Sequence, residues 1–537
     1  MDETIPADYK VEELSSTLVS LRSSSEDALF TVEPIRDNIF RVTFTSHTHP
    51  LPPHPSIPRP QPLFTLPPTL KRADEQLLFE THPNIRLTIR PNPTPVITVE
   101  LEGRQLYSDL PYRSYVFDGT GASRYGCFDP TTLHLGLGER AAPFDLSNRT
   151  FSLSALDAAE YDVYRTDPLY KHIPFLIRAS QKGCVGIVST SHSRGTWSVG
   201  GEIDALWGRY EVMRQNWGGL EVYLIVADSL RELVQSYALL VGYPKMIPRW
   251  SLGYLASSMG YAESDDPPAQ QLLERFPELC KQHDIPCSAM HLSSGYIVSM
   301  VPPKTRNVFT LNTHRFPDAP RLFKTLSEAG IRTIANIKPY ILETHPAYKL
   351  LAEKGAFFKT EEGTVSVTRV WSAGLGESGR GSWLDMTSSA AQEWWYEGVR
   401  GLLNMGIEGI WNDNNEFGLP SDKLLCAGDS SDEEGGTVGL YGRAANTEIM
   451  AQTSFQAISD ANSTKRPYLL TRSATIGTLR YANSSWSGDN YTSWETLRGN
   501  NAMGLTAGLC LLQVPLIKGY YSRWQVIWPR LWWIHRP

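Results

Sequence analysis

After Trp250 the sequence alternates between short apolar segments and longer segments that carry a helical period. Apolar "SLGYLAS" precedes helix-like "PAQQLLERFPELCKQH", and apolar "PCSAMHLS" precedes helix-like "APRLFKTLSEAG". Buried strands that alternate with helices are typical of a parallel sheet. The alternation continues to a seventh strand-like segment, "CLLQVPLI", with one irregular insertion over residues 356–386. The pattern predicts a (β/α)8-type TIM barrel over residues 246–516, with functional residues at the C-terminal ends of its strands.

The first half of the chain has a different pattern. Short alternating segments such as "IFRVTFTS", "NIRLTIRP" and "GCVGIVSTS" are separated by Pro, Gly and Asn. Strands of this length and spacing favour an antiparallel β-sandwich. A helix and a Pro-marked linker over residues 229–249 separate the two patterns, so we predict an N-terminal β-sandwich over residues 1–245.

The composition of the 537-residue chain excludes several classes of protein. Hydrophobic residues make up 41% and charged residues 20%, as expected for a globular protein with more than one domain. The net charge of −7 gives no reason to expect a nucleic acid partner. We expect no membrane helix, because no apolar segment is long enough. The polar N-terminus "MDETIPADYK" shows no signal peptide, which predicts a cytoplasmic location.

The cysteines argue against a metal site. All six are scattered along the chain, without a CxxC pair or a Cys/His spacing. This usage predicts reduced thiols and no bound metal. No organic cofactor motif is present either, so no cofactor is expected. The sequence does not report an oligomeric state.

Charged side chains follow several of the predicted barrel strands. "GIWNDNNE" places Asp413 and Glu416 after the fourth strand, and "LLTRS" places Arg472 after the fifth. The sixth gives "SSWSGDN", with Asp489 beside a glycine and three residues after Trp486. Taken alone, Asp489 could simply cap the helix that follows. Asp413 and Asp489 together, however, would face one pocket, and a pair of carboxylates suits glycoside hydrolysis without a metal.

At these residues the chain resembles glycoside hydrolase family 31, the retaining α-glucosidase and α-xylosidase family. "GIWNDNNE" resembles the nucleophile block of that family, and "RYANSSWSGDNYTSW" is similar to its acid/base block. "PRWSLGY" is similar to the block that opens its barrel. "LGLGERAAPFDL" and "TDPLYKHIPFLI" resemble its N-terminal, galactose-mutarotase-like sandwich. The blocks occur in the family's order over about residues 130–515.

The resemblance implies a role for each matching position. Asp413 would be the nucleophile and Asp489 the acid/base catalyst. Arg472 would bind sugar hydroxyls and help to position the pair. Asp157 would reach over the cleft from a sandwich loop, unless it is an ordinary loop residue. The subsite of the cleaved sugar, −1, would be lined by Trp371, Trp411, Asp385 and Trp486, although the first two could merely pack the mouth of the barrel.

Two positions depart from the family pattern. An acidic block usually follows the second strand, but this chain reads "HLSSGY", with Ser293, Ser294 and Tyr296 in its place. After the third strand, "NIKP" carries Lys338 where the family often has Asp. Tyr296 therefore joins the expected substrate-binding residues. The sugar at −1 is left open among glucose, galactose, N-acetylgalactosamine and others, since a hydroxyl and a lysine could also make the same contacts.

The C-terminal sequence departs as well. Where the family continues with a Gly-rich block and an eighth strand that carries a sugar-binding His, this chain reads "IKGYYSRWQVIWPRLWWIHRP". We expect residues 517–537 to be an aberrant tail and the barrel to lack its last strand through truncation. Such a barrel would expose two sheet edges. His535 does not match the context of the missing His.

The sequence thus predicts a retaining α-glycosidase that acts on terminal α-linked sugars of oligosaccharides or glycosides by double displacement. Two alternatives stay open. An α-transglycosylase would use the same residues, with a sugar hydroxyl in place of water. A catalytically dead carbohydrate-binding protein would follow if the missing strand abolished the chemistry.

Overall fold

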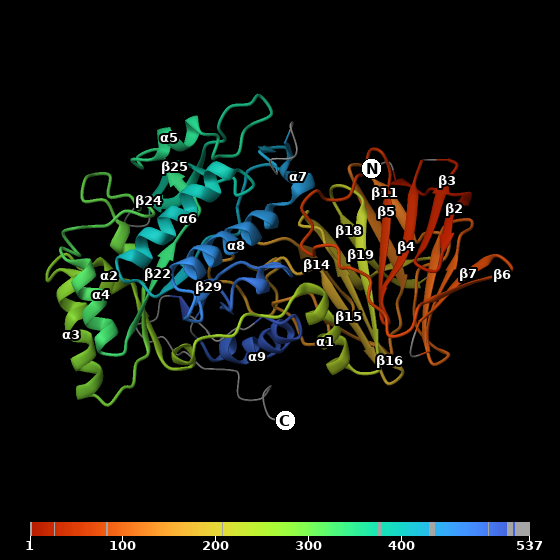
Figure 1. Cartoon of the computed structure of the whole chain (residues 1–537), viewed down its shortest axis with the longest axis horizontal. Coiled ribbons are helices and arrows are strands. Elements are labelled where there is room, and N and C mark those ends of the chain that lie inside the picture. Colours follow the sequence, from red (N-terminus) through yellow and green to blue (C-terminus); the bar gives the residue numbers. More distant parts are fainter. Residues whose placement is uncertain are drawn as a thin grey trace.

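The computed structural model describes residues 3–25, 27–81, 84–206, 208–373, 377–428, 435–491, 493–512 and 519–520. It has a strand-rich half and a helix-rich half, joined through helix α1 (Leu230–Val241) (Figure 1). The strands of the first half run from red to yellow in Figure 1, and the helices of the second half from green to blue. The predicted sandwich followed by a barrel is confirmed.

The N-terminal half consists of antiparallel sheets that pack around one apolar core. That core joins Phe30 and Phe44 to Leu87 and Trp197, all of which are buried. The largest sheet has the strand order β13 (Leu133–Gly136), β15 (Phe175–Ser180), β16 (Gly183–Ser189), β19 (Leu220–Ala227), β5 (Ile39–Thr45), β4 (Leu29–Arg36), β3 (Leu18–Ser23) and β2 (Tyr9–Ser15). The second has the order β1 (Glu3–Thr4), β11 (Tyr115–Asp118), β12 (Gly121–Cys127), β18 (Gly208–Gln215), β17 (Gly195–Asp204) and β14 (Arg149–Leu153). The third has the order β10 (Arg104–Ser108), β9 (Val96–Leu101), β8 (Ile85–Arg90), β7 (Gln76–Thr81) and β6 (Thr69–Ala73).

The second half is built on a parallel sheet whose strands are neighbours in the order of the chain. They are β20 (Leu255–Ser258), β21 (Ala289–Leu292), β22 (Arg332–Ile337), β26 (Gly409–Asn412), β29 (Leu469–Thr471) and β30 (Ser484–Ser485). Helices alternate with these strands, as the sequence predicts. They are α2 (Met259–Glu263), α3 (Ala269–Gln282), α4 (Ala319–Glu328), α5 (Tyr348–Glu353), α6 (Ser389–Asn404), α7 (Val438–Tyr441), α8 (Arg443–Ala461) and α9 (Trp494–Leu509).

The insertion over residues 356–386 is not irregular, so that expectation was wrong. β24 (Thr368–Ala373) and β25 (Glu377–Trp383) pair antiparallel, and β23 (Tyr340–Leu342) extends their sheet. This pairing could not be predicted from the sequence, because the Gly-rich "SAGLGESGRGS" interrupts any alternation of apolar and polar residues. Two small ladders complete the fold: β27 (Leu425–Cys426) with β28 (Gly436–Thr437), and β31 (Asn490–Tyr491) with β32 (Gly519–Tyr520).

The first residues of the predicted seventh strand, Cys510 and Leu511, are not a strand in the structure. Cys510 caps α9, and Leu511 has a positive φ of 63°, so these residues turn instead of extending. Residues 513–517 of that segment lie outside the described residues, as do residues 521–537 with His535. The aberrant tail and the missing last strand therefore stay predictions.

A shared apolar cluster joins the two halves. Phe175 of the sandwich stacks on Tyr237 of α1 with 3.9 Å between ring centroids. Ala474 and Ile476, which follow β29, belong to the same buried cluster, as does Ala507 of α9. α1 and α9 accordingly lie side by side at the junction in Figure 1. The sandwich is thus packed directly against the barrel segments that follow β29 and β30.

Candidate active site

The charged residues after the barrel strands gather at one end of the parallel sheet. The ends of neighbouring strands are in register, because Asn412 pairs with Thr471 and Thr471 pairs with Ser485. Asp413 and Arg472 are the next residues after their strands. In a barrel this C-terminal end is the place where active sites form.

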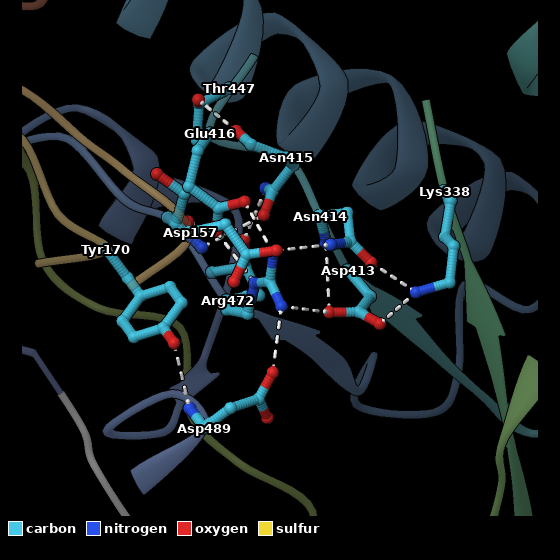
Figure 2. A network of polar contacts seen from close by, with 12 residues as sticks. Asp157, Tyr170, Lys338, Asp413, Asn414, Asn415, Glu416, Thr447, Arg472 and Asp489 are labelled. Atoms are coloured by element: carbon cyan, nitrogen blue, oxygen red, sulfur yellow. Dashed lines mark hydrogen bonds and ion pairs between the residues drawn. The ribbon is translucent and has the colours of Figure 1, made fainter. Parts of the chain in front are cut away.

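Asp413 accepts hydrogen bonds on both of its carboxylate oxygens. Oδ2 accepts from Asn336 Nδ2 at 2.9 Å and from Lys338 Nζ at 2.5 Å. Oδ1 accepts from the main-chain N–H of Asn414 at 2.9 Å and lies 3.4 Å from Arg472 Nη1. Lys338 also donates to the side chain of Asn414 (Figure 2). These contacts fix the orientation of a carboxylate that is almost fully buried.

Arg472 lies at the centre of the cluster in Figure 2. Its Nε and Nη2 donate to the two oxygens of Glu416 at 2.8 and 2.7 Å, a bidentate geometry that is strong and directional. Nη2 also lies 3.0 Å from Asp157 Oδ2. Nη1 donates to Asp489 Oδ2 at 3.2 Å, so the same nitrogen contacts both Asp413 and Asp489. A single buried cation thereby links four carboxylates.

Asp489 is held from the sandwich side. Its main-chain N–H donates to the hydroxyl of Tyr170 at 3.1 Å, and its carbonyl accepts from the N–H of Glu160 at 2.7 Å. The ring of Tyr170 also lies under the guanidinium of Arg472, at 5.1 Å from its centroid. Asp157 reaches the same place, since it accepts from Asn414 Nδ2 at 3.0 Å. The segment between β14 and β15 therefore forms one wall of the site.

The electrostatics of the site favour an ionised Asp413. Burial raises the pKa of this carboxyl, but Lys338 and Arg472 outweigh burial, so that its pKa lies well below the ordinary value. Burial lowers the pKa of Lys338, and Asp413 offsets only part of that effect. Burial also opposes the charge of Arg472, but Glu416 and Asp413 keep its pKa well above the ordinary value.

The other expected site residues lie around this cluster in different settings. Trp411 and Trp486 pack edge to face with 5.5 Å between centroids, inside an apolar cluster of the barrel interior. Tyr296 is buried and donates to the carbonyl of Asn336 at 2.9 Å, and the side chain of Asn336 donates to Asp413. Trp371 lies in β24, but its side chain is outside the described part of the chain. Contact of these aromatic residues with a sugar stays a prediction.

Asp385 has contacts of a structural kind. Oδ1 accepts from the N–H and the hydroxyl of Thr387 at 3.0 and 2.6 Å, at the turn before α6. Oδ2 accepts from the N–H of Ala427 at 2.6 Å. Burial raises the pKa of this carboxyl. These bonds hold two loops together, and a role of Asp385 at −1 also stays a prediction.

Sequence reasoning missed several contacts of the site. Glu416 was noted at the strand end but not as the bidentate partner of Arg472, although its position three residues after Asp413 gave a signal. A weaker signal was present for Tyr170, which lies within the family-like block "TDPLYKHIPFLI". Among the described residues, no group of His, Cys, Asp and Glu has the arrangement of a metal site, and no helix is long and apolar enough to cross a bilayer.

Comparison with known proteins places the chain in a family. Residues 244–516 match the model of the glycosyl hydrolases family 31 TIM-barrel domain, and residues 29–197 match that of the family's N-terminal galactose mutarotase-like domain. Alpha-glucosidase 2 of Bacillus thermoamyloliquefaciens is 26% identical over 379 residues, which are 70% of this chain and 45% of that protein. An alpha-xylosidase of Emericella nidulans is 24% identical and covers 70% of this chain and 44% of its own length. The chain thus spans about half the length of these curated relatives.

A solved structure agrees with these matches. The family 31 dextranase of Flavobacterium johnsoniae in complex with glucose superposes with a TM-score of 0.80 at 18% identity. The superposition covers 96% of this chain and 60% of the dextranase. With matches that include the whole parallel sheet and most of the sandwich, the chain belongs to glycosyl hydrolase family 31.

Proposed function

We propose that the chain is a retaining α-glycosidase in which Asp413 is the nucleophile and Asp489 the acid/base catalyst. One observation carries the proposal: Arg472 Nη1 contacts both carboxylates, at 3.4 and 3.2 Å. Asp413 follows β26 and Asp489 follows β30, the two strands that flank β29 in the barrel sheet. Retaining glycosidases need two carboxyl groups that are close together on opposite sides of the scissile bond. A guanidinium nitrogen that contacts both of them keeps the two carboxyl groups close together.

The mechanism has two displacements. In the first, a carboxylate oxygen of Asp413 attacks the anomeric carbon, while the carboxyl of Asp489 gives its proton to the glycosidic oxygen, which leaves with the bonding electrons. In the second, Asp489 takes a proton from water as the water oxygen attacks the anomeric carbon, and Asp413 is released. Lys338 and Arg472 favour the ionised nucleophile that the first step requires.

The substrate class follows from the relatives. Those compared are named alpha-glucosidase, alpha-xylosidase and dextranase, which supports an α-linked sugar at −1 for this chain as well. Lys338 donates to Asp413, and Ser293 and Ser294, which follow β21, are buried. The identity of the sugar and a cytoplasmic location stay predictions.

The test is hydrolysis of a panel of p-nitrophenyl α-glycosides by the wild-type chain, Asp413→Asn and Asp489→Asn. We expect hydrolysis by the wild type, a loss of at least about 10³-fold with Asp413→Asn, and an α-configured first product in proton NMR spectra. A fluorinated glycosyl fluoride should trap a covalent adduct on the peptide that contains Asp413. An inverted product, or an adduct elsewhere, would contradict the proposal. Addition of an acceptor sugar separates a transglycosylase, which would form a transfer product, from a hydrolase. Absence of hydrolysis on every glycoside of the panel would favour a binding protein.

A further inference from the structure

Lys171 is a buried lysine of the sandwich whose three donors all have acceptors. Its Nζ lies 2.6 Å from Glu139 Oε2, 3.1 Å from the carbonyl oxygen of Arg472 and 2.8 Å from that of Trp486. The side chain of Lys171 has a relative exposure of 0%, and that of Glu139 has 1%. An ammonium group has three protons and no lone pair, so these contacts use its full capacity. Lys171 therefore has no donor left for a sugar.

The two carbonyls belong to neighbouring barrel strands at the point where each strand ends. Arg472 is the first residue after β29, and Trp486 is the first after β30. Asp489 follows three residues after Trp486. One ammonium group thus connects the residue that carries the central guanidinium with the loop that carries Asp489.

Neighbouring contacts hold the same two segments. Tyr170 accepts from the N–H of Asp489, and its ring backs the guanidinium of Arg472. The N–H of His172 donates to the carbonyl of Ala474 at 3.0 Å. Three successive sandwich residues therefore contact the segments after β29 and β30. Of these three, Lys171 donates to a main-chain carbonyl of each segment.

We propose that Lys171, oriented by Glu139, is a positioning residue that sets the place of Asp489 relative to Arg472. Its kinetic consequence rests on the proposed glycosidase function, whereas its structural consequence does not. A buried ion pair is rarely the most stable choice for a protein interior, because apolar residues of similar volume avoid the cost of desolvation. The two carbonyls explain why a charged pair is present here, because an apolar side chain could not donate hydrogen bonds to them.

The experiment compares two double variants with the wild-type chain. In Lys171→Met/Glu139→Gln both charges are removed together, so that no unpaired charge stays buried. The matched control, Arg178→Met/Glu211→Gln, removes a buried pair of the sandwich whose nitrogen and oxygen lie 3.6 Å apart and whose side chains are 4% and 5% exposed. Hydrogen exchange is measured by mass spectrometry on peptides that cover residues 469–474 and 484–491, and kcat and KM are measured on the best p-nitrophenyl glycoside.

We expect faster exchange in those peptides for the Lys171 variant and unchanged exchange there for the control. We also expect kcat to fall by about 10- to 100-fold, the usual effect of a small displacement of catalytic groups, with KM changed by less than about threefold. The proposal is overturned if exchange in both peptides equals that of the wild type, or if the control increases it equally. If the wild type hydrolyses nothing, the proposed function fails by itself, and the exchange result alone decides the role of Lys171.

Discussion

Lys338 Nζ lies 2.5 Å from Oδ2 of Asp413, and both side chains are buried. This contact is a large part of the reason why the pKa of Asp413 lies below its ordinary value. Replacement by Lys338→Met removes the charge, so the pKa of Asp413 should rise. A carboxylate with a higher pKa is protonated at a higher pH, so the acidic limb of kcat/KM should move upward. The profile is measured from about pH 3 to about pH 8.

The exposed Lys349 provides the control for that profile. Its Nζ lies 3.9 Å from Glu353 on the surface of α5, and its side chain is 91% exposed. Lys349→Met should leave the acidic limb where it is in the wild type. An acidic limb that does not move in Lys338→Met would show that Asp413 does not depend on this lysine for its ionisation.

Arg472 should be essential for stability as well as for activity. Arg472→Met leaves Glu416, Asp413 and the partly exposed Asp157 and Asp489 without their common cation. Loss of one partner of a buried ion pair typically costs about 3–5 kcal/mol of unfolding free energy. We expect a clearly lower urea midpoint, together with loss of hydrolysis. Arg380→Met, which breaks an exposed pair with Glu343, should leave the midpoint nearly unchanged.

Gly488 allows the close packing of the Asp489 loop on Tyr170. Its φ is +78°, and a Cβ there would meet Cε2 of the Tyr170 ring at 1.9 Å. Gly488→Ala should therefore displace the loop and reduce kcat by at least about 10-fold. Gly363→Ala is the matched control, because Gly363 has a φ of +82° but open space around the new atom. The control should show only the backbone cost, about 1 kcal/mol in thermal unfolding, with kcat intact. Equal kcat values for the two variants would contradict this account of Gly488.

Buried histidines predict a loss of stability in mild acid. Burial lowers the pKa of His134 and of His172 to about 4. In the unfolded chain the imidazole pKa is about 6.5, so the unfolded state binds more protons between these values. The free energy of unfolding should therefore decrease as the pH falls from about 6.5 to about 4, and this contribution should level off below that range. Urea unfolding at a series of pH values measures the slope.

His172→Gln tests the assignment of that slope. The variant should show a smaller decrease in unfolding free energy across the same pH range, because one of the groups that gains a proton on unfolding is gone. His47→Gln, at an exposed position, should retain the slope of the wild type. If His172→Gln keeps the full slope, other groups are responsible for it.

The sequence was sufficient to locate Asp413, Arg472 and Asp489 at one end of a barrel. Asp413 and Arg472 follow apolar strands, Asp489 follows the short segment "SSWSG", and alternation of strands and helices brings all strand ends to the same face. Such periodicity is local, so it can be read without knowing the tertiary structure. The family resemblance then implied which role each of these residues would have.

Contacts across the two halves could not be read in this way. The hydrogen bond between Tyr170 and Asp489 joins residues 319 positions apart, and that between Lys171 and Trp486 joins residues 315 positions apart. No local pattern encodes such pairs, since they depend on how the sandwich docks on the barrel. Asp157 was expected at the cleft only by resemblance, and its contacts with Arg472 and Asn414 depend on the same docking.

The wall formed by the sandwich also has a consequence for the order in which the site is made. During synthesis the sandwich leaves the ribosome first and can fold before β29 and β30 exist. Tyr170 and Lys171, which contact the segments after β29 and β30, are therefore synthesised before those segments. A ribosome that stalls between α8 and β30 would hold a nascent chain that contains the sandwich wall of the site but not yet Asp489.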